Sequence, residues 1–129
     1  MDLNIIEEKV TEYQPYDLQI QIFKVLTHPA RLAILEILRN GEQCVCHMEA
    51  HLGFRQAYIS QQLSVLREAG LVQDRRVGWN IFYRVADRRI YEVLNAVRQI
   101  TSQNEPEARQ PITICNCPKC NPQGINGSK

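Results

Sequence analysis

The chain has 129 residues, of which 44% are hydrophobic, and a formal net charge of +1, so it is long enough for one compact domain with its own core. It contains no run of 18 apolar residues, and residues 1–12 are acidic and lack the apolar stretch of a secretory signal. We therefore expect a cytoplasmic protein with no membrane partner.

The first predicted elements are an N-terminal arm and two helices. Residues 1–14 carry no apolar periodicity, and we interpret them as a loose arm. Apolar residues then recur at helical spacing over 16–27, directly after Pro15, which suits the start of a helix. Pro29 restarts the chain as a second helix, and Asn40 and Gly41 end it.

Two further helices are predicted with a tight break between them. Residues 43–52 form a short third helix whose start holds two cysteines, and residues 53–55 are the break. Residues 56–69 form a fourth helix, with Ile59, Leu63 and Leu66 on one face, and Gly70 stops it. The opposite face is polar and consists of Gln56, Ala57, Ser60, Gln61, Ser64 and Arg67, with Tyr58 beside it.

The pattern after Gly70 predicts a hairpin and a last helix. Residues 71–76 and 79–85 have the β-branched and aromatic content of two short strands, with Gly78 at the turn. Asp87 is a plausible cap for a helix whose apolar stripe runs from Ile90 to Ile100. Residues 102–129 hold four of the six prolines and form a tail. The predicted domain therefore spans 15–101.

Helix, tight turn, helix and hairpin describe a mainly α fold with a small β-hairpin, the winged helix-turn-helix. Residues 55–89 carry seven arginines against three carboxylates, a local net charge of +4, and a basic surface is what phosphate contact requires. An ordinary helical pair with a solvated charged face is the alternative. The candidate contacts to double-stranded DNA are Gln56, Ala57, Tyr58, Ser60, Gln61 and Arg67 on the helix, and Arg75, Arg76 and Gly78 in the hairpin.

Five cysteines fall in two clusters, Cys44 with Cys46 and, in the tail, Cys115, Cys117 and Cys120. In a reducing compartment, close-set thiols are more often metal ligands or redox groups than structural disulfides. Residues two apart in a regular helix point roughly 200° apart. A shared ion, with sulfurs on the order of 4 Å apart, therefore needs a non-helical start to the third helix. A helix N-terminus also favours the thiolate.

Three segments resemble the ArsR/SmtB family of metal-sensing repressors. Residues 24–38 (KVLTHPARLAILEIL) resemble its second-helix region, 42–46 (EQCVC) its metal-binding loop, and 56–72 (QAYISQQLSVLREAGLV) its recognition helix. The resemblance covers about residues 16–100. It implies a homodimer joined through 16–26 and 90–100 that leaves its operator when an ion binds. Arg55 stands where relatives have a capping Ser or Thr, and Ala57 replaces a common Ser.

The resemblance also bears on the missing ligands. Two thiolates are too few, because arsenite needs three sulfurs and cadmium, lead or zinc takes three or four. Some relatives have a third cysteine where Glu49 stands here, and others use cysteines of a terminal arm, often across the dimer. We therefore expect ligands from Cys115, Cys117 and Cys120, while His47 is more often a solvated side chain. At the family's second site, Asp87 matches but Arg89, Ile100 and Gln103 do not, and we assign no metal there.

We predict a metalloregulatory repressor that is released from operator DNA by a thiophilic ion. Arsenite or antimonite is favoured, with cadmium, lead or zinc as the other ions. A thiol-redox or persulfide-sensing repressor of the same fold is the alternative. Cys117 and Cys120 also fit half of a structural zinc site, and Cys117 with Pro118 a haem contact. No nucleophile, base and acid set and no phosphate loop is found, so we expect neither an enzyme nor a small-molecule substrate.

Overall fold

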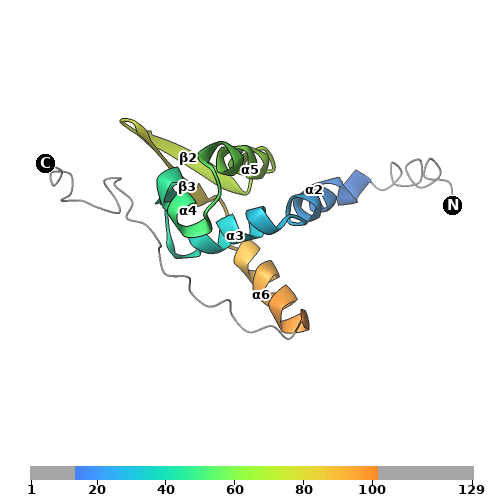
Figure 1. The fold of residues 1–129 in the computed structure, drawn as a ribbon. Coiled ribbons are helices and arrows are strands. Elements are labelled where there is room, and N and C mark those ends of the chain that lie inside the picture. Colours follow the sequence, from blue (N-terminus) through green and yellow to red (C-terminus); the bar gives the residue numbers. More distant parts are fainter. Residues whose placement is uncertain (1–13, 102–129) are drawn as a thin grey trace, which may run out of the picture.

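The computed structural model describes residues 14–101, and the predicted arm and tail fall almost wholly outside this range (Figure 1). The described part is mainly helical with a small sheet, which confirms the predicted fold class. Its elements are η1 (Gln14–Tyr16), α2 (Asp17–Val25), α3 (Pro29–Ile37), η2 (Leu38–Asn40), β1 (Gln43–Cys44), α4 (Val45–Leu52), α5 (Gln56–Glu68), β2 (Val72–Val77), β3 (Asn80–Val85) and α6 (Ile90–Thr101).

The boundaries of α3 follow from its first and last residues. Pro29 occupies the first turn, where a missing N–H costs nothing, and the Nδ1 atom of His28 accepts the backbone N–H of Ala30 at 3.1 Å. The predicted end at Asn40 is correct for the helical stretch as a whole, but its last turn tightens into the 3-10 helix η2. The chain leaves this turn at Gly41.

The sheet has three antiparallel strands in the order β1-β3-β2, so β3 is central. The sequence predicts β2 and β3 to within a residue at each end, and it does not predict β1. The sequence pattern predicts residues 43 and 44 at the start of the third helix, which instead begins at Val45. A strand of two residues is too short to show an alternating pattern, and only its pairing with Tyr83 and Phe82 defines it.

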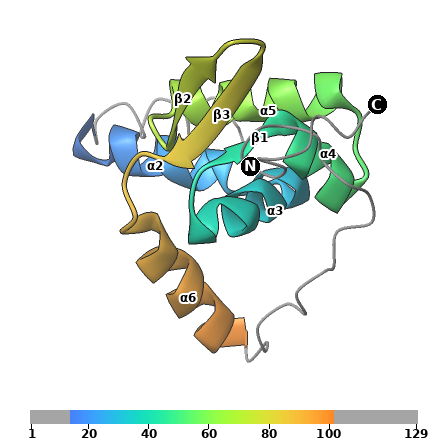
Figure 2. The same cartoon turned by 90° about the vertical axis from the view of Figure 1, so that its left-hand side faces the viewer.

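One hydrophobic core joins α3, α4, α5, the hairpin and α6. The side chains of Ile34, Leu35 and Met48 are fully buried in it, as are Ile59 and Leu63 of α5. In both views the hairpin and α5 occupy one end of the molecule and α6 extends from the other (Figures 1 and 2). The hairpin and the outward side of α5 therefore lie at the same end of the molecule, where one ligand could contact both.

Polar contacts join α6 to α3 near both ends of α6. The hydroxyl of Tyr91 donates to the carbonyl of Leu35 at 2.6 Å, and burial raises the pKa of Tyr91 to about 12. Arg98 forms an ion pair with Glu36. Burial alone would raise the pKa of Glu36, but hydrogen bonds from Arg39 and Arg98 outweigh it and lower that pKa.

Asp87 precedes α6 as a cap of the turn that leads into the helix, as predicted. Its carboxylate accepts the backbone N–H of Arg89 at 2.9 Å, and its carbonyl accepts the N–H of Ile90. The side chain of Arg89 forms an ion pair with the same carboxylate, and the pKa of Asp87 falls to about 2 because of these hydrogen bonds.

Apolar side chains remain exposed on α2 and α6. Phe23 is 58% exposed on α2, and Val97 and Ile100 are 50% and 81% exposed on α6. Val93 continues the α6 stripe one turn earlier, at helical spacing from Val97. Within residues 14–101, no helix is both long enough and apolar enough to cross a bilayer.

Candidate DNA interface and cysteine site

The pair α4 and α5 forms the helix-turn-helix. Gly53 ends α4 with a positive φ of 74°, which the short turn to α5 requires. Two hydrogen bonds that sequence reasoning missed join α3 to α5 and to α2. Arg31 donates to the side chain of buried Gln62 at 2.9 Å and to the carbonyl of Val25 at 3.2 Å.

The outward side of α5 carries the predicted reading residues. Gln56, Ala57 and Gln61 are exposed and Ser60 is half-buried. Within the described range, the side chains of Gln56, Ser60 and Gln61 have no hydrogen-bond partner. Arg55 precedes the helix without a side-chain cap, as the sequence predicts. Amide and hydroxyl groups on this surface can therefore bond to base edges.

Two other predicted DNA residues are already engaged within the molecule. The hydroxyl of Tyr58 lies 3.3 Å from Nε2 of His28, and its ring contacts Phe54. Arg67 lies in the last turn of α5 and forms an ion pair with Asp74 at 3.4 Å. Both side chains would have to give up or share these contacts to reach DNA.

The arginines of the hairpin also differ in whether their charge is already paired within the molecule. Arg75 forms two hydrogen bonds with Glu42, at 2.5 and 3.1 Å, and these bonds raise the pKa of Arg75. Arg76 is exposed and has no ion pair or hydrogen bond within residues 14–101. Arg84 bonds only the neutral amide of Gln73 in this range, so its charge also remains uncompensated. Phosphate contact is therefore most accessible to Arg76 and Arg84.

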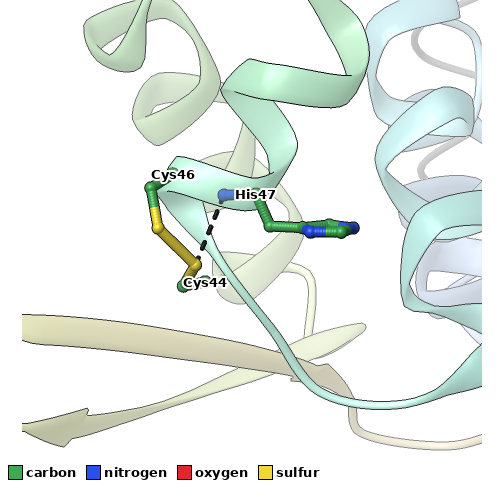
Figure 3. Close-up of a disulfide and its surroundings, with 3 residues drawn as sticks. All are labelled: Cys44, Cys46 and His47. Atoms are coloured by element: carbon green, nitrogen blue, oxygen red, sulfur yellow. Dashed lines mark hydrogen bonds between the residues drawn. A yellow bond between two sulfur atoms is a disulfide. The ribbon is translucent and has the colours of Figure 1, made fainter. Parts of the chain in front are cut away.

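Cys44 and Cys46 meet where β1 passes into α4, and the structure joins them as a disulfide (Figure 3). Cys44 is extended and is the N-cap residue of α4, with its sulfur accepting the backbone N–H of His47 at 3.3 Å. Both sulfurs therefore lie on one side of the chain, as the predicted non-helical start requires. The imidazole of His47 points away from them in Figure 3, and its ring centre lies 4.8 Å from that of His51 with the two rings tilted by 41°.

The cysteine pair packs against the hairpin. Cys44 is 2% exposed and forms a small apolar cluster with Phe82 of β3, against which the half-buried Cys46 also packs. The guanidinium of Arg75 lies 5.4 Å from the Phe82 ring centre, on the strand that pairs with β3. A change at the sulfurs therefore reaches the central strand of the hairpin through one side chain.

The tail cysteines Cys115, Cys117 and Cys120 lie outside the described residues. Within residues 14–101, no group of three or more His, Cys, Asp or Glu side chains is placed to hold a metal ion. Sequence reasoning missed the pairing of Glu42 with Arg75, which are 33 residues apart. If the hairpin is placed beside residues 42–46, the opposite charges of Glu42 and Arg75 predict this ion pair.

The family model described as "Bacterial regulatory protein, arsR family" matches residues 28–74. The "Biofilm growth-associated repressor" of Agrobacterium fabrum is 46% identical over 79 residues, which cover 61% of this chain and 68% of that protein. The chain belongs to the ArsR/SmtB family. The predicted family resemblance is thereby confirmed.

Two further similar proteins are informative. The "Arsenical resistance operon repressor" of Escherichia coli is 43% identical over 70 residues, covering 54% of this chain and 60% of that protein. The homodimeric winged helix-turn-helix DNA-binding domain Mb0332 from Mycobacterium bovis superposes with a TM-score of 0.64 at 25% identity, covering 77% of this chain and 92% of that one. As an ArsR/SmtB member, the chain is a DNA-binding transcriptional repressor and not an enzyme.

Proposed function

We propose that this repressor binds operator DNA as a homodimer and is released when a thiophilic ion binds Cys44, Cys46 and sulfur from the tail. Arsenite or antimonite is the favoured ion, with cadmium, lead or zinc as the others. The observation that carries the proposal is the meeting of the two sulfurs at the junction of β1 and α4. The name of the Escherichia coli relative supports an arsenical inducer.

The chemistry of the cysteine pair fits such an ion in its reduced form. The two Cα atoms are 5.4 Å apart, so the thiolates can separate to the order of 4 Å without moving the backbone far. The N–H of His47 and the start of α4 would stabilise negative charge on Cys44. These residues supply two of the three sulfurs that arsenite needs, and we assign the third to Cys115, Cys117 or Cys120.

The reading surface is the outward side of α5. Gln56, Ser60 and Gln61 would bond base edges in the major groove, with Ala57 and Tyr58 making closer apolar contacts. In the hairpin, Arg76 and the turn at Gly78 would approach the backbone and minor groove. Arg67 and Arg75 belong to the same proposed surface, but their ion pairs lead us to expect smaller contributions. The DNA-binding domain in this proposal is 15–101, in a cytoplasmic protein.

The proposed dimer seam consists of α2 and α6. Exposed apolar side chains cover both helices, among them Leu18, Phe23, Val97 and Ile100. Large apolar side chains left exposed on neighbouring turns of a helix favour an association site. The homodimeric state of the Mycobacterium bovis domain supports the same arrangement here.

Ion binding would alter DNA binding through the hairpin. Cys44 contacts Phe82, and Arg75 lies over the same ring while bonding Glu42, two residues before Cys44. Moving Cys44 toward a third sulfur would shift β1 against β3 and disturb this contact. The hairpin of each protomer would then lose the position that matches its half-site, and operator affinity would fall.

A thiol-redox or persulfide-sensing repressor is the second candidate, and the Cys44–Cys46 disulfide favours it. In this version the oxidised pair is itself the signalling state. It requires no third ligand, and the same contact with Phe82 would carry the change. The two candidates differ in which reagent releases the operator.

The first prediction concerns the double variant Cys44→Ser/Cys46→Ser. It should bind an operator duplex, selected from random-sequence DNA by the reduced wild-type protein, with unchanged affinity, because neither side chain lies on α5. Arsenite should weaken binding of the wild type about tenfold and leave the variant unaffected. Fluorescence anisotropy of labelled duplex measures both, with arsenite, cadmium, lead and zinc each added.

The matched control is His47→Ala, which removes a nearby side chain that points away from the sulfurs. It should respond like the wild type. Normal ion response in the double variant would refute the cysteine site. Release by peroxide or persulfide, with no release by any of the four ions, would support the redox candidate instead.

The second prediction concerns Glu42→Gln. Losing the carboxylate removes the charge that compensates Arg75, so this guanidinium becomes available to phosphate. Operator affinity should rise about threefold at physiological salt, and the plot of log affinity against log salt should steepen by about 0.9. Anisotropy titrations at several salt concentrations provide the measurement. Glu92→Gln makes the same charge change on α6 and should leave the slope unaltered.

A further inference from the structure

Trp79 is the single tryptophan of the chain and lies at the tip of the hairpin. Val77 pairs with Asn80, so Gly78 and Trp79 form a two-residue loop. Gly78 has a φ of +60°, which is the left-handed conformation that the first loop position of such hairpins needs. Gly78 therefore meets the needs of the turn, and the turn does not require tryptophan at the next position.

The indole of Trp79 contributes nothing to the core, because its side chain is 99% exposed. An aromatic side chain of this size commonly buries about 150–250 Å² when it packs. Other strongly exposed apolar residues, such as Leu18 and Ile100, lie on the proposed dimer seam. The hairpin whose turn contains Trp79 extends away from α6 (Figure 2), so the α6 part of the proposed seam does not explain the exposure of Trp79. This placement indicates contact with another partner.

The surroundings of Trp79 favour a polyanion as that partner. Arg76 lies in β2, three residues before Trp79, and has no ion pair within residues 14–101. Farther from the tip, Arg84 of β3 bonds only the neutral Gln73 in this range and adds a second uncompensated charge to the hairpin. Asn80 follows Trp79 and adds an amide near the tip. In both views the hairpin and α5 occupy the same end of the molecule, so a duplex held by α5 passes near the hairpin (Figures 1 and 2).

We propose that Trp79 is a direct DNA contact and enters the minor groove next to the half-site that α5 reads. The indole packs against deoxyribose and base edges there, and Arg76 holds the adjacent phosphate. Apolar wedges in the minor groove favour steps that unstack easily, such as TA. Trp79 therefore adds a preference for the flanking sequence. This inference rests on the DNA-binding role of the family and is independent of the inducer.

Because the chain has one tryptophan, its own emission reports the contact. We expect operator duplex to quench and blue-shift this emission in the reduced wild-type protein. The change should saturate at the DNA concentration that saturates anisotropy of the labelled duplex. This measurement uses no variant, so the folding of a mutant does not affect it. Unchanged emission at saturating DNA would overturn the proposal.

The variants Trp79→Ala, Trp79→Phe and Arg76→Ala separate the apolar contact from charge. Trp79→Ala should weaken operator binding about tenfold with the salt slope unchanged, and Trp79→Phe should retain most of the affinity. Arg76→Ala should instead reduce the salt slope by about one. Replacing the TA steps that flank the half-site by GC should lower the operator affinity of the wild type more than it lowers the affinity of the Trp79→Ala variant.

Three outcomes would count against Trp79 as a DNA contact. Wild-type affinity in Trp79→Ala, or a loss with an altered salt slope, would each overturn it. An emission shift that follows protein concentration without DNA would assign the indole to a contact between protein copies. If the wild type bound no duplex at all, the DNA-binding role itself would be refuted. This outcome can be told apart from the three above because in those the wild type still binds DNA or its emission changes without DNA.

Discussion

Val97→Asp is expected to convert the protein to a monomer and to weaken operator binding by at least about a hundredfold. Val97 is half-exposed on α6, within the stripe that also contains Val93 and Ile100. In the proposed dimer this stripe would meet apolar surface of the second copy, and moving an ionised carboxylate from water into that surface costs free energy. Two linked DNA-binding domains bind a palindromic operator much more tightly than one domain does. A monomer therefore loses this additional affinity.

Light scattering or sedimentation measures the mass of the Val97→Asp variant, and anisotropy measures its operator affinity. Gln99→Asp is the matched control, because it places the same charge on the exposed surface of α6 away from the stripe. It should remain dimeric and bind normally. A dimeric Val97→Asp variant with normal affinity would exclude α6 from the seam. Circular dichroism should show native helix content, since the side chain is not buried in the protomer.

Leu63→Ala is expected to lower the free energy of unfolding by about 3 kcal/mol. Leu63 is fully buried in the core beneath α5, and truncation removes apolar contacts while leaving a cavity. The reading side of the helix is chemically unchanged. Under conditions where the variant is folded, its operator affinity should therefore stay within about threefold of the wild type.

Urea unfolding followed by circular dichroism gives the free energy, and both proteins must be compared at equal protomer concentration because dimer stability depends on it. Ser64→Ala, at the next position on α5, should change the free energy by less than about 0.5 kcal/mol. A loss below about 1 kcal/mol for Leu63→Ala would mean that α5 is not packed as described. Loss of DNA binding in a folded Leu63→Ala variant would mean that the cavity moves the reading surface.

The helical framework could be predicted from the sequence because its signals are local. Pro29, Gly53 and Gly70 mark where helices start or stop, and the spacing of Ile59, Leu63 and Leu66 identifies the buried side of α5. The hairpin followed from β-branched and aromatic residues on both sides of Gly78. These are short-range properties of the backbone and of hydrophobic periodicity.

The contacts around the cysteines could not be predicted because they depend on tertiary pairing. β1 exists only through its register with Phe82 and Tyr83, and two residues carry no pattern. The charges of Glu42 and Arg75 are visible in the sequence, but their meeting depends on how the hairpin lies beside β1. The exposure of Trp79 was equally hidden, because an aromatic residue in a strand region usually predicts burial.

The Cys44–Cys46 bond encloses a very short stretch of backbone, because its partners are two positions apart. On the chain-entropy account, closing so small a ring stabilises a protein by about 1.5 kcal/mol, which is far below what a bridge between distant segments contributes. Breaking or remaking this bond therefore changes the stability of the fold little, and its structural effect falls on the contact of Cys44 with Phe82. In the thiol-redox candidate, reduction of this bond by a cellular thiol would therefore return each oxidised molecule to its operator-binding form without synthesis of new protein.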